Sequence, residues 1–443
     1  MSSGPASRHR RGRPIASLCL IAATIGAVLA LSTSSAALGE SVTALGRPAT
    51  KPEHVVAIGD IHGDFDAFLG LLTHVGLIDG ERRWSGRDIT LVQTGDYMDR
   101  GPKVRPLLDF LMTLEAQAAA GGGRAIVLMG NHEASNAIGV LRDVPPSAFA
   151  AFADAESEGR REAAYAAHVK LAEARRAALA RADAAIPIPK IYMIPERDAW
   201  MAAHPAGLVE YLEALGPNGT YGKWIRTRMV LVRINDTVFL HGGINPDVAP
   251  KKLESLNEQA QKEIARWDRM RKQMIEQQIA LPSFTFEELL EAGGSELIRV
   301  GLEARGRLDM NGQADPAAAA ALAISSHPLA ALQEIGKWAI LDPNGPLWFR
   351  GYATWRSEEG GPQLDQLQRR FGPVRFVVGH TMTSGFRAMG RFSSRVFLID
   401  TGMLSSYYAG GRASALDIQN GTYTVVTLED RRVLFEPMSS AAR

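Results

Sequence analysis

Polar residues of the kinds that bind metal ions, phosphate or protons stand just after short apolar runs. The first such run, VVAIGDIHGD at 55–64, passes from aliphatic residues into Asp60, His62 and Asp64. Carboxylate, imidazole and amide ligands without sulfur suit Mn, Fe, Zn or similar ions. Such a set is too large for one ion with an open position, and it suits two ions that share a bridging carboxylate during phosphoryl displacement. The candidates are Asp60, His62, Asp96, Asp99, Arg100, Asn131, His132, His241, His380 and Asp400.

These candidates require a sheet that brings distant loops together. Each follows a short β-branched or aliphatic run of the kind that predicts a buried strand. In sheets built with helical crossovers, the loops beyond the carboxyl ends of the strands form one shared crevice. The sequence therefore predicts an α/β fold with the candidate residues at one edge. Besides the first run, the runs are DITLVQTGDYMDRG (88–101), AIVLMGNHE (125–133), TVFLHGGINP (237–246), RFVVGHT (375–381) and RVFLIDTG (395–402).

Composition limits the class of protein and of chemistry. The 443 residues are 46% hydrophobic, enough for one large domain or two ordinary ones. Aromatic residues make up only 7%, which favours helical additions around an α/β centre. Cys19 is the only cysteine and lies in the N-terminal segment. If that segment is removed, disulfides, a catalytic cysteine and a cysteine-based zinc site are excluded.

Residues 1–37 have the pattern of a secretory signal peptide. The basic stretch RHRRGRP precedes the apolar stretch IASLCLIAATIGAVLAL and a small-residue exit, STSSAALG. We therefore expect an exported, periplasmic or secreted protein, with an uncleaved membrane anchor as the alternative. Removal of four arginines leaves 45 basic residues against 48 acidic ones, so the formal charge goes from +1 to −3. No basic footprint for nucleic acid is present, and contact with a membrane is expected only if the segment stays uncleaved.

The motifs GDIHGD, GDYMDRG, GNHE, HGG and GHT, in this order, resemble the signature of the calcineurin-like metallophosphoesterases, and specifically the PPP-type protein phosphatases. GPLWFRG (345–351) and RVFLIDTGM (395–403) resemble most closely the Shewanella-like phosphatase branch. The resemblance implies a β-sandwich flanked by helices, with the metallophosphatase domain spanning 50–440.

The resemblance also implies roles for individual residues. Two divalent or trivalent ions of the Mn, Fe or Zn class would be held by Asp60, His62, Asp96, Asn131, His241 and His380, with Asp96 shared between them. A bridging hydroxide would attack phosphorus. His132 would protonate the departing oxygen, with Asp99 orienting it. Arg100 and Arg350 are predicted to grip the phosphoryl oxygens, since a guanidinium fork matches that geometry.

Two acids near these motifs are given structural roles. Asp64 stands where it can accept backbone N–H groups of the next helix as an N-cap. Asp400 is interpreted as a turn-forming or supporting residue rather than a metal ligand.

Two helical insertions are predicted within the domain, at about 146–227 and 251–340. In the first, Phe149, Phe152, Tyr165 and Val169 fall at helical spacing, which predicts one amphipathic helix over 147–185. In the second, Leu253, Leu256, Ala260, Ile264, Trp267, Met270 and Met274 form an apolar stripe, interpreted as core packing. Both insertions leave the core near the predicted crevice, so a substrate-selecting rim is a hypothesis for them.

The predicted function is hydrolysis of a phosphomonoester, carried by a phosphorylated protein (phosphotyrosine or phosphoserine/threonine) or by a small molecule. One alternative is a dinucleoside tetraphosphate hydrolase. Another is a binding protein with a relict site, which the intact set of ligands argues against. DTGMLSSYYAGG replaces the SAPNY-like segment of eukaryotic PPP enzymes, so their regulatory subunits are not expected here. No oligomeric state is predicted.

Overall fold

A computed structural model describes residues 54–182, 188–309 and 315–437. The predicted signal peptide at 1–37 lies outside these residues. Within the described part of the chain, no helix combines the length and the apolar character that crossing a membrane requires.

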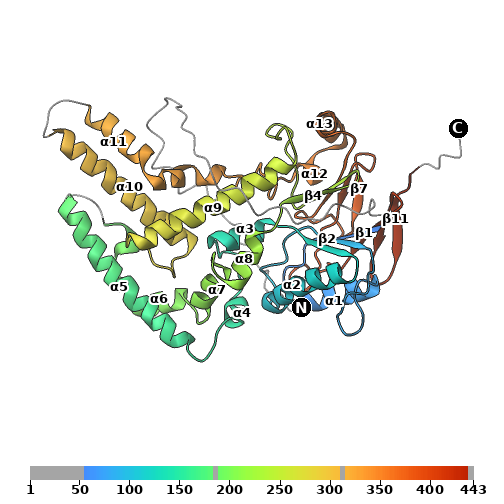
Figure 1. The fold of residues 1–443 in the computed structure, drawn as a ribbon, viewed down its shortest axis with the longest axis horizontal. Helices are drawn as coiled ribbons and strands as arrows, with labels where there is room; N and C mark the ends of the chain where they lie inside the picture. Colours follow the sequence, from blue (N-terminus) through green and yellow to red (C-terminus); the bar gives the residue numbers. More distant parts are fainter. Residues whose placement is uncertain (1–53, 183–187, 310–314, 438–443) are drawn as a thin grey trace, which may run out of the picture.

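Two β-sheets form the centre of the molecule (Figure 1). The six-stranded sheet has the order β11-β10-β9-β1-β2-β3 and the five-stranded sheet the order β4-β5-β6-β8-β7. The first comprises β1 (His54–Ile58), β2 (Thr90–Gln93), β3 (Arg124–Val127), β9 (Ala415–Gln419), β10 (Thr422–Val426) and β11 (Arg431–Phe435). The second comprises β4 (Leu231–Ile234), β5 (Thr237–Leu240), β6 (Arg375–Val378), β7 (Met389–Arg391) and β8 (Val396–Leu398).

Alternation along the strands builds two separate hydrophobic cores. In β1, Val55 and Ala57 pack into the layer between the sheets, whereas Val56 and Ile58 pack into the core beneath the helices. The ring of Phe397 from one sheet stacks on that of Tyr423 from the other, with centroids 4.3 Å apart. Both faces of the central strands are therefore buried, which explains their continuous apolar runs.

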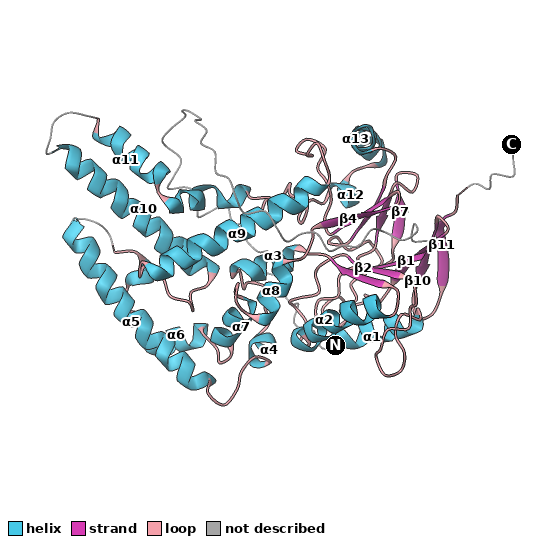
Figure 2. Cartoon of the chain, viewed as in Figure 1, coloured by secondary structure: helices cyan, strands magenta, loops and turns pink. Residues whose placement is uncertain are grey.

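Helices cover the outer faces of the two sheets (Figure 2). On the six-stranded sheet, α2 packs against β3 and also against α1. On the five-stranded sheet, α12 packs against β8. This is the helix-flanked sandwich that was predicted. The helices of this layer are α1 (Phe65–His74), α2 (Val104–Ala120), α12 (Gly351–Thr354) and α13 (Ser357–Phe371). The short helix α3 (Asn131–Ile138), which follows β3, instead packs against the helices beside the sandwich.

The remaining helices form a second body beside the sandwich, here called the helical body (Figure 1). Its members between β3 and β4 are α4 (Pro146–Ala150), α5 (Ser157–Ala182), the 3-10 helix η2 (Lys190–Tyr192), α6 (Arg197–Ala203), α7 (Leu208–Leu215) and α8 (Thr220–Arg226). Its members between β5 and β6 are α9 (Glu254–Glu276), α10 (Phe286–Asp309), α11 (Pro316–Ser326) and the 3-10 helix η3 (Pro328–Lys337).

The prediction of one helix over 147–185 is wrong, because the chain breaks between α4 and α5. The Asp154 carboxylate accepts the Glu156 N–H, and the Asp154 N–H donates to Ser157 Oγ. Such local bonds compete with the helix ladder and favour a turn. Residues 183–185 lie outside the described part of the chain. In contrast, the stripe predicted for α9 is buried along its whole length, as expected for core packing.

Candidate active site

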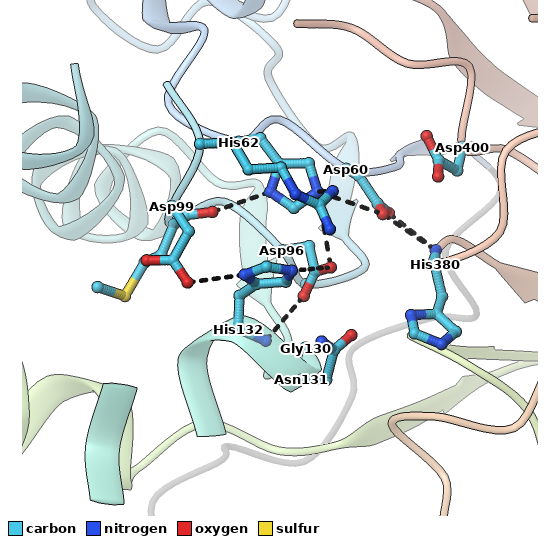
Figure 3. A network of polar contacts seen from close by, with 12 residues as sticks. Asp60, His62, Asp96, Asp99, Gly130, Asn131, His132, His380 and Asp400 are labelled. Carbon is cyan, nitrogen blue, oxygen red and sulfur yellow. Dashed lines mark hydrogen bonds and ion pairs between the residues drawn. The ribbon is translucent and has the colours of Figure 1, made fainter. Parts of the chain in front are cut away.

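The predicted site residues lie at the carboxyl ends of parallel strands from both sheets. In the six-stranded sheet, β1 pairs parallel to β2 and β2 parallel to β3. In the five-stranded sheet, β5 pairs parallel to β6 and β6 parallel to β8. Because all these strands end at the same edge of the sandwich, residues more than 300 positions apart converge there (Figure 3).

Several of the predicted site residues have left-handed backbone conformations. The φ angles of His62, Asp96, Asp99, Arg100 and His380 lie between 48° and 66°. Non-glycine residues rarely adopt such angles, and each costs about 1–3 kcal/mol. The tight turns that follow the strands therefore hold these side chains at the expense of local backbone strain.

Glycines in the same motifs allow the loops that carry the candidate ligands to approach one another closely. Gly95 has φ +98°, and a Cβ there would lie 2.5 Å from the Gly130 nitrogen. A Cβ on Gly379 would lie 2.2 Å from Asp60 Oδ1. Side chains at these positions would push apart the loops that carry the candidate ligands.

The Asp96 carboxylate lies at the centre of the cluster. Its Oδ2 atom is 3.2 Å from His241 Nε2 and 3.7 Å from the Nε2 atoms of both His62 and His132. His241 Nε2 is also 2.9 Å from Asn131 Oδ1 and 3.1 Å from His380 Nδ1. Asp96 thus faces both halves of the cluster, as a shared ligand must: one half contains His62, and the other contains His241 and His380.

Asp60, which lies near His62, is hydrogen-bonded to the backbone of His380 in the other half of the site. Both of its carboxylate oxygens accept the His380 backbone N–H, at 3.0 and 3.1 Å. Its Oδ2 lies 3.9 Å from His62 Nε2 and its Oδ1 lies 4.0 Å from His241 Nδ1. The structure therefore brings together all six residues predicted to bind metal.

Backbone carbonyls orient the three candidate histidine ligands. His62 Nδ1 bonds to the Met98 carbonyl at 2.9 Å, and His241 Nδ1 bonds to the Thr94 carbonyl at 3.1 Å. Each of these rings can donate its Nδ1 proton and turn an unprotonated Nε2 toward Asp96. His380 is turned the other way: its Nε2 bonds to the Trp348 carbonyl at 3.1 Å, which leaves Nδ1 toward the cluster.

The electrostatics of the site favour cations. Burial, together with the charges of Asp400 and Asp96, holds the pKa of Asp60 well above its usual value. Burial and the neighbouring His132 hold the pKa of His62 well below its usual value, so this ring is neutral. Crowded buried carboxylates beside neutral imidazoles are the donor set that a metal ion needs. His62, Asp96 and His132 offer ligand atoms within 4.8 Å of one another, and so do Asp96, His241 and His380.

His132 forms a buried pair with Asp99. Its Nδ1 lies 2.7 Å from Asp99 Oδ2 (Figure 3). Burial works to lower the pKa of His132, but the charge of Asp96 and the bond to Asp99 outweigh it and raise this pKa to about 9. Cations bound at Asp96 would offset part of that increase. Because Nδ1 is held by Asp99, Nε2 is the atom that can exchange a proton with a bound molecule.

The two arginines differ in their surroundings. The Arg100 guanidinium contacts His62 Nε2 and the hydroxyl of Tyr408, and lies over the rings of Tyr407 and Tyr408. Arg350 is exposed and donates through Nη1 to the His380 carbonyl at 3.0 Å and to Thr381 Oγ1 at 2.9 Å. Both guanidinium groups thus lie beside candidate ligands, one from each half of the site.

Asp64 and Asp400 have the structural contacts predicted for them. The Asp64 side chain caps α1 by accepting the Ala67 N–H at 3.1 Å. The Asp400 side chain accepts the Gly402 N–H at 3.0 Å and shapes the turn after β8.

Sequence reasoning gave no role to Glu133, although it belongs to the GNHE motif. Its buried carboxylate accepts the backbone N–H groups of Gly130, Asp96, Tyr97 and Met98 at distances of 2.8 to 3.0 Å. It thereby joins the loop after β2 to the start of α3. The presence of a glutamate at this motif position was the only signal available. Tyr408 and Tyr211 were also missed. Tyr211 lies outside the quoted motifs, and Tyr408 lies in DTGMLSSYYAGG, a segment that was interpreted only as a departure from the eukaryotic enzymes.

The Glu133→Gln substitution is expected to destabilise the fold. Glutamine replaces one acceptor oxygen by a donor, so two buried backbone N–H groups lose their partner. Each such loss costs about 1–3 kcal/mol, which gives roughly 2–6 kcal/mol of unfolding free energy. Urea denaturation followed by circular dichroism measures this change. Glu81→Gln, at an exposed glutamate, is the control and is expected to change stability by no more than about 0.5 kcal/mol. Equal stabilities of the two variants would contradict this role of Glu133.

Comparison with known proteins identifies the family. The family model described as calcineurin-like phosphoesterase matches residues 53–296, more than half of the chain. The chain belongs to the calcineurin-like phosphoesterase family. The predicted resemblance and the class of metal-dependent phosphatases are confirmed at this level.

The chain is also similar to individual proteins of other organisms. The chain is 25% identical over 380 residues to an uncharacterised protein of Schizosaccharomyces pombe, a match covering 85% of this chain and 80% of that protein. It is 31% identical over 213 residues to Shewanella-like protein phosphatase 2 of Arabidopsis thaliana and 26% identical over 203 residues to Shewanella-like protein phosphatase 1 of Plasmodium berghei. These two matches cover 47% and 46% of this chain, and 51% and 42% of the named phosphatases.

Among solved structures, the cold-active protein tyrosine phosphatase of a psychrophilic Shewanella species is similar in sequence at 22% identity. The match covers 86% of this chain and 80% of that one, with a TM-score of 0.47.

Proposed function

We propose that this phosphoesterase hydrolyses phosphomonoesters at a centre of two metal ions, with phosphorylated proteins as its substrates. Asp60, His62 and Asp96 would hold one ion, and Asp96, Asn131, His241 and His380 would hold the other. The observation that carries the proposal is the position of Asp96 Oδ2, which faces His62 and His241 from the two halves of the site. When bound, such ions supply an activated water and neutralise the charge of a phosphoryl group.

Residues of this chain supply the proton for the leaving group. Asp99 fixes the His132 ring through Nδ1, so that Nε2 can donate a proton to the departing oxygen. His132 lies as close to Asp96 as His62 does, so the distance to Asp96 alone does not separate an acid from a ligand. We assign the acid role to His132 because its other nitrogen is held by a carboxylate, which stabilises the protonated ring.

The arginines are assigned to the substrate phosphate. Arg350 lies at the exposed side of the site, next to His380. Arg100 lies at the side of His62 and is backed by Tyr408. Two guanidinium groups placed in this way can bind phosphoryl oxygens from opposite sides and orient the ester toward His132. The exposure of Arg350 leaves room for the protein chain that carries the phosphate.

Protein substrates are proposed because the two named curated relatives are both called protein phosphatases. The test supplies the manganese-reconstituted enzyme with phosphotyrosine, phosphoserine and phosphothreonine peptides, and separately with diadenosine tetraphosphate. We expect inorganic phosphate to be released from at least one peptide. Release of ADP from the dinucleotide without any turnover of peptide would instead indicate a dinucleoside tetraphosphate hydrolase. Absence of both bound metal and turnover would indicate a relict site.

A further inference from the structure

A residue of the helical body reaches the back of the proposed acid pair. Tyr211 lies in α7, which belongs to the stretch between β3 and β4, and it is fully buried. Its hydroxyl donates to Asn136 Oδ1 at 2.6 Å, across 75 residues of sequence. Asn136 in turn lies on α3, one turn after His132.

Asn136 connects this hydroxyl to the acid pair. Its Nδ2 atom donates to Asp99 Oδ1 at 2.9 Å and to the His132 carbonyl at 2.9 Å. Asp99 uses its other oxygen, Oδ2, to hold His132 Nδ1 at 2.7 Å. A continuous series of hydrogen bonds therefore leads from Tyr211 through Asn136 and Asp99 to His132.

We propose that Tyr211 is a positioning residue that fixes the geometry of the acid pair, and that the helical body serves the chemistry through it. This inference rests on the proposed role of His132 as the general acid. It differs from a substrate-selecting rim, because Tyr211 is buried behind the acid pair and touches no substrate.

Tyr211 can fix the acid pair because the nitrogen and oxygen ends of the Asn136 amide need different hydrogen-bond partners. An amide presents two donors at nitrogen and only acceptors at oxygen. The Tyr211 hydroxyl supplies the donor that the oxygen end requires, while both N–H groups are used by Asp99 and the His132 carbonyl. If the amide rotated by half a turn, its oxygen would face the Asp99 carboxylate and the His132 carbonyl, and repulsion would move Asp99 away from the imidazole.

Packing within the helical body fixes Tyr211 itself. The rings of Phe149 and Phe152 meet the Tyr211 ring edge to face, with centroids 5.2 and 5.1 Å apart. Phe149 belongs to α4 and Phe152 to the break that follows it. Aromatic pairs of this kind hold a ring in one orientation. The turn between α4 and α5 therefore contributes to the position of Tyr211, because it holds the Phe152 ring against it.

The test compares Tyr211→Phe with Tyr192→Phe. Tyr192 is a matched control, because it is also fully buried in the helical body and donates to a single acceptor, the Ile279 carbonyl at 2.9 Å, away from the site. Each variant is assayed with phenyl phosphate, whose leaving oxygen needs a proton, and with 2,4-dinitrophenyl phosphate, whose leaving oxygen does not. We expect Tyr211→Phe to lower kcat for phenyl phosphate by roughly 2- to 13-fold, the effect of one hydrogen bond. The kcat for the dinitrophenyl ester, and both rates of Tyr192→Phe, are expected to stay at the wild-type level.

A second readout does not depend on turnover. The Nδ1 proton of His132 is expected to give a distinct NMR signal because a carboxylate holds it, and this signal is expected to shift in Tyr211→Phe but not in Tyr192→Phe. Equal losses for both esters, or identical behaviour of the two variants in both measurements, would overturn the inference. If Tyr211→Phe fails to fold, Asn136→Ala is measured in the same way, with the same expected pattern. If the wild-type enzyme hydrolyses neither ester, the proposed function fails instead.

Discussion

The His132→Asn variant is expected to lower kcat for phenyl phosphate by about 10²- to 10⁴-fold, the usual contribution of a general acid. Asparagine retains a polar side chain near Asp99 but has no ring nitrogen that can hold and release a proton at the position of Nε2. The two ions bound per chain are expected to remain, because His132 is assigned as the general acid and not as a metal ligand. Steady-state kinetics and elemental analysis of the purified variant measure the two quantities together.

The dependence on the leaving group separates an acid from a metal ligand. With 2,4-dinitrophenyl phosphate the loss in His132→Asn is expected to be much smaller, since that leaving group departs without a proton. If the variant lost both esters equally and also lost metal, His132 would be a ligand. That outcome would agree with its 3.7 Å distance from Asp96 Oδ2 and would contradict the assignment as acid.

The Asp96→Asn variant is expected to bind fewer than two ions per chain and to lose at least about 10³-fold in kcat/KM. The substitution removes the carboxylate charge that lies nearest to both His62 and His241 and leaves a neutral amide between the two halves of the site. Metal ions contribute several kcal/mol of transition-state stabilisation, and each 1.36 kcal/mol is a factor of ten in rate. Elemental analysis and kinetics with phenyl phosphate measure both effects.

Asp400→Asn is the matched control for this variant. Asp400 is buried at the same edge of the sandwich, but its carboxylate accepts the Gly402 N–H and shapes a turn. We expect it to retain two ions per chain. Loss of metal in Asp400→Asn to the same extent as in Asp96→Asn would show that any buried acid of the site acts in this way, and would remove the special role of Asp96.

The sequence predicted most of the fold and the location of the site because strand ends leave a strong local signal. A buried strand such as β1 is an apolar run, and the polar residues that follow it mark the edge of the sheet at which ligands bind. Once the strands were expected to be joined by helical crossovers, the loops that carry Asp60, Asp96 and Asn131 were expected to share one crevice. The roles of these residues came from the family resemblance, and the structure shows only that they lie together.

The features that were missed depend on contacts that no local pattern records. Glu133 holds four backbone N–H groups that become neighbours only after folding. Tyr211 reaches Asn136 across the helical body and has no motif around it. The break between α4 and α5 was missed because helical spacing of Phe149 and Phe152 persists through a turn whose bonds involve Asp154 and Ser157.

Electron paramagnetic resonance of the manganese-reconstituted protein tests the central claim most directly. If Asp96 joins the two halves of the site, two Mn²⁺ ions bind per chain at roughly 3.5 to 4 Å from each other, and their spectrum shows magnetic coupling that disappears in Asp96→Asn. Binding of a single ion, or of two ions without coupling, would contradict the account.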